Sequence, residues 1–263
     1  MAARGVLTRI IDVRGHGRST CGQDGACGAP PDGGYASEDD SHYWIGRPGD
    51  SLDENQIIRD LARHVADLRG RWPNARITVG GHSSGGGVVS RFIEHGGLAS
   101  VESVALLAPF NHFDRPQNVP PTPPLCSDTA GSAYAQVDLA ALGAALRGDR
   151  HRYVLNFKKD PELTTALDTL HYSYTTMTGM AADNPNDFLA AYSEPLLWVA
   201  AREDALLDLD ESRRQFERAP GGGAFIEVAG TSHVGLSWSD AVAELLARWS
   251  IDPGQVSSGT LEP

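Results

Sequence analysis

Two adjacent serines, Ser83 and Ser84, stand in the glycine-rich stretch VGGHSSGGGV. A serine can act as a nucleophile on a sharp strand-to-helix turn, where side chains two positions before and after it would collide. If Ser83 is the nucleophile, those two positions hold Gly81 and Gly85. If Ser84 is the nucleophile, the first position holds the imidazole of His82, which would clash. The pattern therefore favours Ser83, with the backbone N–H of Ser84 facing the oxyanion.

Two other interpretations of this stretch are a plain glycine-rich turn and a phosphate-binding loop. The spacing contains neither GxGxxG nor the Gly-Lys-Ser/Thr of a P-loop. The flanks predict a strand over residues 76–79 and a helix over residues 88–95, and Gly86 and Gly87 would let that helix pack closely. A strand before and a helix after is the context typical of a nucleophile elbow.

A serine is a weak nucleophile unless a base takes its proton and a third group orients that base. In a parallel sheet such groups come from the carboxyl ends of later strands. The predicted strand at 196–201 runs into Asp204, and the predicted strand at 225–228 runs into His233. The order Ser83, Asp204, His233 is the serine–acid–histidine order of α/β-hydrolases.

Strands and helices alternate on both sides of a long interruption, which predicts a mainly parallel α/β sheet flanked by helices. The capping box at 51–54 predicts the start of a helix whose apolar face continues to about Gly70. The remaining elements expected are strands at 6–12 and 101–107 and helices at 211–218 and 240–249.

The interruption is read as an inserted cap. It contains a proline-rich stretch at 116–124, an Ala/Leu helix at 139–146 and a Tyr/Thr/Met segment at 171–180. The domain organisation predicted is a first part of the core at 1–108, a cap at 109–193, a second part of the core at 194–250 and a poorly ordered tail at 251–263.

Four pieces of the chain together carry a family resemblance: DVRGHGRS at 12–19, GHSSGG at 81–86, RED at 202–204 and GTSH at 230–233. The chain resembles an α/β-hydrolase of the lysophospholipase or monoacylglycerol-lipase-like group, with a serine aminopeptidase-like domain. The resemblance implies an α/β-hydrolase fold with a cap over the site. It further implies ester hydrolysis through an acyl-enzyme on Ser83, with His233 as base and Asp204 as its orienter, and without metal or organic cofactor.

Several neighbouring residues compete for these roles. The family's Gly-x-x-Asp pattern, here Ala-x-x-Asp, selects Asp204 over Glu203 and Asp208. We expect His82 to be structural, with its side chain directed into the packing of the turn. His16 is likewise expected to be a turn residue, and His42, beside the acidic residues 38–40, is expected in a solvated loop, with cation binding as the alternative.

Aromatic and methionine side chains of the predicted cap could line an acyl pocket or form the cap's own core, and the sequence does not choose between the two. They are Phe110, His112, Phe113, Tyr172, Tyr174, Met177 and Met180.

The resemblance also implies fold upstream of Met1. Family members usually begin with two or three more strands, and the loop after the third carries the second oxyanion donor; ordinary element lengths give roughly 40–60 residues for this part. Either the sequence begins inside a longer gene product, or it is a short variant that closes its sheet edge differently. Loss of one oxyanion donor lowers turnover by about 10²- to 10³-fold, and an open strand edge invites association. We therefore expect the 263-residue form to be weakly active and prone to associate.

Composition narrows the class of protein. The chain has 263 residues, 41% hydrophobic, and a net charge of −12, which argues against nucleic-acid binding and favours neutral or cationic small partners. It has no apolar run long enough for a transmembrane segment and no signal-peptide core at its start. The three cysteines, Cys21, Cys27 and Cys126, are interpreted as free or buried thiols in a reducing compartment, and we expect the protein in the cytoplasm. A Cys21–Cys27 disulfide is the alternative, which would accompany a signal peptide lying upstream.

Three functions remain open at this level. The leading hypothesis is a serine hydrolase of lipid-like or small acyl esters. The second is amide or peptide cleavage, or perhydrolysis, on the same three residues. The third is a catalytically impaired or silent homologue lacking its N-terminal strands.

Overall fold

The computed structural model describes residues 4–13, 50, 53–110, 135–157, 171–184, 188–190, 192–204 and 206–262. The chain divides into two compact units. The first comprises Met1–Arg9, Ile58–Pro121 and Met180–Pro263, and the second comprises Ile10–Ile57 and Thr122–Gly179.

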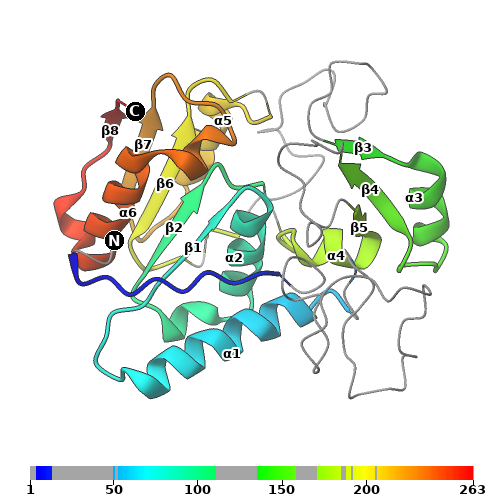
Figure 1. Ribbon diagram of the computed structural model, residues 1–263, viewed down its shortest axis with the longest axis horizontal. Helices are drawn as coiled ribbons and strands as arrows, with labels where there is room; N and C mark the ends of the chain where they lie inside the picture. The colour runs from blue at the N-terminus through cyan, green and yellow to red at the C-terminus, as the bar shows by residue number, and fades with distance from the viewer. Residues whose placement is uncertain are drawn as a thin grey trace. The chain divides into compact units, whose positions relative to one another are not determined.

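The first unit contains a five-stranded sheet in which every pairing is parallel (Figure 1). Its strands, in spatial order, are β1 (Thr78–His82), β2 (Ser103–Leu107), β6 (Leu196–Ala201), β7 (Gly223–Val228) and β8 (Gly259–Leu261). Because all five run the same way, their carboxyl ends meet at one edge of the sheet.

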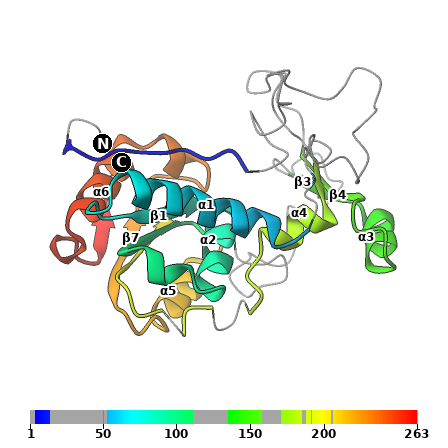
Figure 2. The same ribbon diagram turned by 90° about the horizontal axis from the view of Figure 1, so that it is seen from below.

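Helices connect these strands, as parallel neighbours require. Figure 2 shows α5 and α6 on opposite sides of the sheet. The helices are α1 (Gln56–Arg71), α2 (Ser84–Glu94), α5 (Leu209–Phe216) and α6 (Asp240–Ile251), with short 3₁₀ turns η3 (Gly97–Ser100), η5 (Gly235–Trp238) and η6 (Pro253–Gln255).

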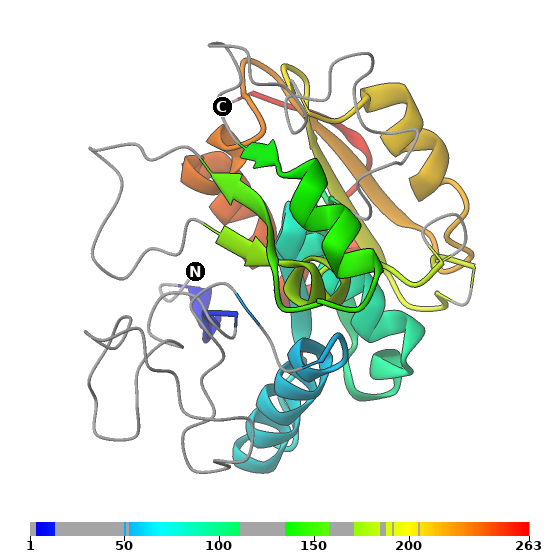
Figure 3. The same ribbon diagram turned by 90° about the vertical axis from the view of Figure 1, so that its right-hand side faces the viewer.

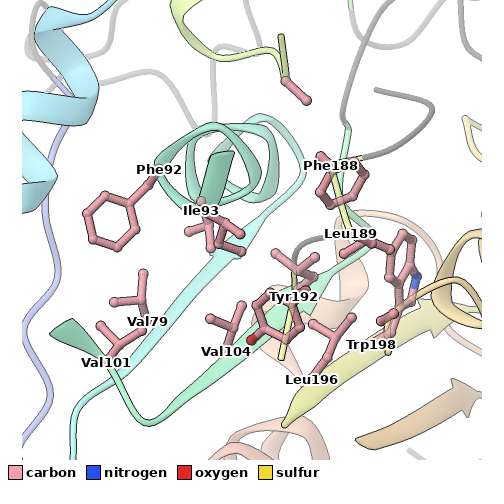
Figure 4. Packing of buried hydrophobic residues seen from close by; sticks show 14 of the residues in the cluster. Val79, Phe92, Ile93, Val101, Val104, Phe188, Leu189, Tyr192, Leu196 and Trp198 are labelled. Atoms are coloured by element: carbon pink, nitrogen blue, oxygen red, sulfur yellow. The ribbon is translucent and has the colours of Figure 1, made fainter. Parts of the chain in front are cut away.

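The main core of this unit lies between the sheet and the helices on one of its faces (Figure 4). Alternate strand residues point into it, as the two-residue period of a strand dictates. Phe92 and Ile93 of α2 pack there with Val104 of β2 and with Leu196 and Trp198 of β6. Each large apolar side chain buried in this way contributes about 1.5–3 kcal/mol, and residues of both β1 and α2 belong to this core, which anchors the two ends of the turn between them.

The predicted alternation of strands and helices is confirmed from residue 76 onward, but the start of the first helix is wrong. α1 begins at Gln56 rather than directly after Ser51, which lies outside the described residues. The Asp53 carboxylate accepts from the N–H of Asn55 at 2.8 Å, which forms a turn, and Glu54 forms an ion pair with Arg150.

The strand predicted at residues 6–12 is not formed. These residues are described without regular structure, and the side chain of Ile10 is 90% exposed. A strand exists only beside a partner, and none of the described strands pairs with this segment. The segment is held instead through Arg9, whose Nη1 lies 2.7 Å from the Asp67 carboxylate.

The prediction of a poorly ordered tail at residues 251–263 is also wrong. Residues 259–261 form β8, which pairs with β7, and Ala229 donates its N–H to the Leu261 carbonyl at 3.0 Å. Phe225 donates its N–H to Ser258 Oγ at 2.9 Å. Terminal segments are often disordered unless they are tied down, and here pairing with β7 ties the segment down.

Two arginines form ion pairs with one glutamate of β7, Glu227. Glu227 on β7, whose side chain is 17% exposed, pairs with Arg202 at 3.0 Å and with Arg213. Arg202 also donates to Thr260 Oγ1 of β8 at 3.3 Å. The hydrogen bond from Arg202, assisted by Arg213, lowers the pKa of Glu227 below its usual value of 4.5.

Glu227→Gln is expected to lower the free energy of unfolding by about 1 kcal/mol at pH 7, since it removes the charge from this network. A lowered pKa in the folded state means that the contribution is present above the ordinary pKa and is lost as the pH falls through the folded value. Urea unfolding at pH 7 and at pH 3 measures this: the gap between wild type and variant should close in acid. A gap of equal size at both pH values would contradict it.

The second unit contains an antiparallel sheet in the order β3 (Ala135–Val137), β4 (Tyr153–Phe157) and β5 (His171–Ser173) (Figure 3). Its helices are α3 (Leu139–Leu146) and α4 (Tyr174–Gly179). The helix predicted at 139–146 is confirmed; Asp138 caps it by accepting from the N–H of Ala141 at 2.8 Å. The cap boundaries and the cap's covering role stay predictions.

Candidate active site

Ser83 stands at the turn between β1 and α2 in a strained backbone conformation. Its φ is 53° and its ψ is −124°, a region that residues with a side chain rarely occupy. Three hydrogen bonds to the Ser83 carbonyl oxygen hold the turn. Their donors are the N–H groups of Gly86 at 2.8 Å, Gly87 at 3.3 Å and Phe110 at 2.9 Å. The Ser83 N–H donates to Leu107 at the end of β2 at 3.0 Å. The serine is therefore fixed to the sheet and to the start of α2.

The steric reasoning that selected Ser83 holds for Gly81 and is wrong for Gly85. A Cβ on Gly81 would lie 2.1 Å from the Gly85 carbonyl oxygen and 2.6 Å from the Gly86 nitrogen. A Cβ on Gly85 would meet none of the described residues within 4 Å. Gly86 and Gly87 are needed for close packing as predicted: a Cβ on Gly87 would lie 2.0 Å from the Met180 carbonyl oxygen.

Gly81→Ala is therefore expected to destabilise the protein by about 3 kcal/mol, since the contacts it creates are with backbone that cannot rotate away. Gly85→Ala is the matched control and should leave stability unchanged or slightly raised, because alanine favours helix. Thermal unfolding of both variants measures the difference. Equal loss of stability in the two would contradict the steric role of Gly81.

A continuous chain of hydrogen bonds joins the three residues predicted from the strand ends. His233 Nε2 lies 2.8 Å from Ser83 Oγ, and His233 Nδ1 lies 2.7 Å from Asp204 Oδ2. The side chains of His233 and Asp204 are each only 4% exposed. Serine donating to the imidazole, and the imidazole donating to the carboxylate, is the arrangement that activates a hydroxyl for nucleophilic attack.

The second oxygen of Asp204 is also occupied. Oδ1 accepts from the N–H groups of Leu206 at 2.7 Å and Leu207 at 3.0 Å. These two amides fix the plane of the carboxylate, so that Oδ2 is directed at His233. The competing acids are placed differently: Glu203 is exposed, and Asp208 caps α5 by accepting from the Glu211 N–H at 2.8 Å.

Ser84 is the first residue of α2. The first amides of a helix have no acceptor within the helix, and the helix dipole favours negative charge beside them. This is the placement expected of an oxyanion donor directly after the nucleophile, and that role of Ser84 stays a prediction.

His82 has contacts that the sequence did not reveal. We expected its side chain to serve the packing of the turn; instead its ring lies against the loop that carries His233. His82 Nε2 is 2.8 Å from the His233 carbonyl oxygen, and Nδ1 is 3.1 Å from Ser237 Oγ. Burial, and then the neighbouring His233, lower the pKa of His82 below its usual value of 6.5.

Of the residues considered for an acyl pocket, Tyr174 and Met177 pack against the small apolar cluster formed by α3 and β4, and Phe110 and Met180 are buried. The contacts of Tyr174 and Met177 favour a role for these two residues in the core of the second unit. Seven other residues discussed from the sequence lie outside the described residues. They are His16, Cys21, Cys27, His42, His112, Phe113 and Cys126.

In the described ranges, no three His, Cys, Asp or Glu side chains gather as a metal site would require. The helices of those ranges include none that is long and apolar enough to cross a bilayer.

The chain matches one protein family and is similar in fold to several solved structures. The family model described as serine aminopeptidase, S33, matches residues 1–234. No curated protein sequence matches the chain. A monoacylglycerol lipase from Paleococcus ferrophilus superposes with a TM-score of 0.52 at 15% identity, over 75% of this chain and 76% of that one.

Two further solved structures are similar. A pyrethroid hydrolase, PytH, superposes with a TM-score of 0.52 at 18% identity over 97% of this chain and 90% of that one. DcsB, solved with a substrate analogue, gives a TM-score of 0.53 at 18% identity over 77% of this chain and 74% of that one. At these identities the likeness establishes a shared fold.

Proposed function

The chain belongs to the S33 serine aminopeptidase family and is a serine hydrolase with the α/β-hydrolase fold, and on that premise we propose that it cleaves carboxylic esters through an acyl-enzyme on Ser83. The observation that carries the proposal is the hydrogen-bond chain from Ser83 through His233 to Asp204, with contacts of 2.8 and 2.7 Å. Nucleophile, base and orienting acid are thus in contact.

The proposed reaction uses these groups in turn. His233 Nε2 takes the proton of Ser83 Oγ as the oxygen attacks the ester carbonyl. Asp204 stabilises the imidazolium that forms, and the Ser84 N–H faces the developing oxyanion. His233 then gives the proton to the leaving alcohol. Water, deprotonated by the same imidazole, attacks the acyl-serine; His233 then returns that proton to Ser83 Oγ as the acid leaves, which regenerates the free serine.

Lipid-like or small acyl esters are the substrate class we propose. The lipase and pyrethroid hydrolase of similar fold are named for ester substrates, and the net charge of −12 favours neutral or cationic substrates over polyanions. The three side chains supply the nucleophile and the proton transfers, so the reaction as written needs no cofactor.

Peptide or amide cleavage is the second candidate, because the matching family is described as serine aminopeptidase. The same residues would serve, but the leaving group would be an amine that must be protonated as it departs. Turnover of p-nitrophenyl acyl esters against aminoacyl and prolyl p-nitroanilides separates the two. Faster relative hydrolysis of the anilides would favour the peptidase.

Labelling with a fluorophosphonate tests the proposal directly. We expect a single adduct, which peptide mapping by mass spectrometry finds on Ser83 and not on Ser84, and loss of ester turnover in proportion to labelling. A folded protein that takes up no label and hydrolyses no ester would overturn the proposal in favour of a catalytically silent protein.

A further inference from the structure

His82 joins two segments that lie far apart in the sequence. It is the last residue of β1 and directly precedes Ser83, whereas its ring contacts residues 233 and 237. Its own backbone is fixed, since His82 pairs with Leu107 in the ladder between β1 and β2. The ring therefore projects from a rigid strand end.

The segment on the other side of this contact alternates between exposed and buried residues. His233 follows β7, and beyond it Val234 is 38% and Trp238 is 79% exposed, whereas Leu236 between them is buried. The imidazole of His233 is held through its ring nitrogens by Ser83 and Asp204. The backbone of His233 is held by His82, through its carbonyl oxygen.

The partners determine which nitrogen of His82 carries the proton. A carbonyl oxygen only accepts, so Nε2–H donates to His233. In the neutral ring Nδ1 is then an acceptor, and it accepts a hydrogen bond from the Ser237 hydroxyl. The titratable groups that face the ring are His233, whose ring centroid is 5.0 Å away, and Asp204 beyond it.

We propose that His82 is a positioning residue: it ties the backbone of His233 to the strand that carries Ser83, and so fixes the distance between base and nucleophile. The inference rests on the proposed function. Because His82 and Ser83 are adjacent at the end of β1, the contact limits how far the backbone of His233 can move away from Ser83 when the loop after β7 moves.

His82→Leu is expected to lower kcat for a p-nitrophenyl ester by on the order of 10- to 100-fold with KM little changed, because proton transfer depends steeply on placement. His82→Gln should recover most of this loss, because its amide N–H can reach the same carbonyl and its amide oxygen can accept from Ser237. Ser237→Ala should lower kcat only about threefold. His64→Leu, on the half-buried side of α1, is the matched control and should behave as wild type.

Nitrogen-15 NMR of the histidine side chains gives a readout independent of turnover. In wild type we expect His82 to be protonated at Nε2. We also expect the Nδ1–H of His233 to exchange slowly with water in wild type and His82→Gln, and at least tenfold faster in His82→Leu. If His82 had a purely structural role, its substitution would change the unfolding temperature, but the exchange rates of the His233 Nδ1–H would not follow this order.

The outcomes separate the two proposals. An active wild type whose His82→Leu variant equals it in kcat and in exchange would overturn the positioning role and leave the proposed function intact. An inactive wild type in which the exchange still follows the expected order would support the positioning role and overturn the proposed function. If His82→Leu does not fold, Ser237→Ala decides: wild-type kcat and exchange there would overturn the positioning role.

Discussion

Replacing Ser83 with alanine is expected to lower kcat for ester hydrolysis by about 10⁴- to 10⁶-fold and to abolish fluorophosphonate labelling. The variant lacks Ser83 Oγ, which lies 2.8 Å from His233 Nε2 and is the proposed nucleophile. Its fold should persist, because alanine has the same Cβ and the backbone bonds that hold the turn are unchanged. The loss of one hydrogen bond should lower the free energy of unfolding by only about 1 kcal/mol.

Ser84→Ala is the matched control for this prediction. The role proposed for Ser84 uses its backbone N–H, which the substitution keeps, so labelling and kcat should stay within about threefold of wild type. Steady-state turnover of a p-nitrophenyl ester and gel fluorescence of the labelled proteins measure both variants. The assignment of the nucleophile is contradicted if Ser84→Ala loses activity and Ser83→Ala keeps it.

Replacing Asp204 with asparagine is expected to lower kcat by about 10⁴-fold. In the folded protein, the N–H groups of Leu206 and Leu207 donate to Oδ1 at 2.7 and 3.0 Å. These donors would hold the carbonyl oxygen of the new amide, so its NH₂ would face His233 Nδ1. That nitrogen must then accept a hydrogen bond instead of donating one, so the neutral ring carries its proton on Nε2. With Nε2 protonated, His233 cannot take the proton of Ser83.

Asp208→Asn is the control for the same chemical change at a neighbouring position. Asp208 accepts from the Glu211 N–H at the start of α5, and asparagine caps a helix equally well. We expect wild-type kcat and unfolding temperature for this variant. An Asp204→Asn enzyme within tenfold of wild type would show that Asp204 does not control the protonation of His233.

The sequence determined the features that depend on neighbours along the chain. Apolar spacing and glycine punctuation predicted β6 without error and α2, β7 and α6 to within a few residues. Parallel strands bring their carboxyl ends to one edge, so Asp204 and His233 could be placed near Ser83 before any distance was known. The requirement for glycine at position 81 followed from the sharpness of the turn alone.

Only the tertiary structure decided the features that depend on a partner distant in the chain. Residues 259–261 became β8 because β7 offers them a pairing edge, whereas residues 6–12 pair with none of the described strands even though β1 also lies at an edge of the sheet. The same holds for His82: its position beside the nucleophile was plain from the sequence, but the direction of its ring was not. A carbonyl 151 residues away accepts its hydrogen bond, and no local pattern of residues encodes that contact.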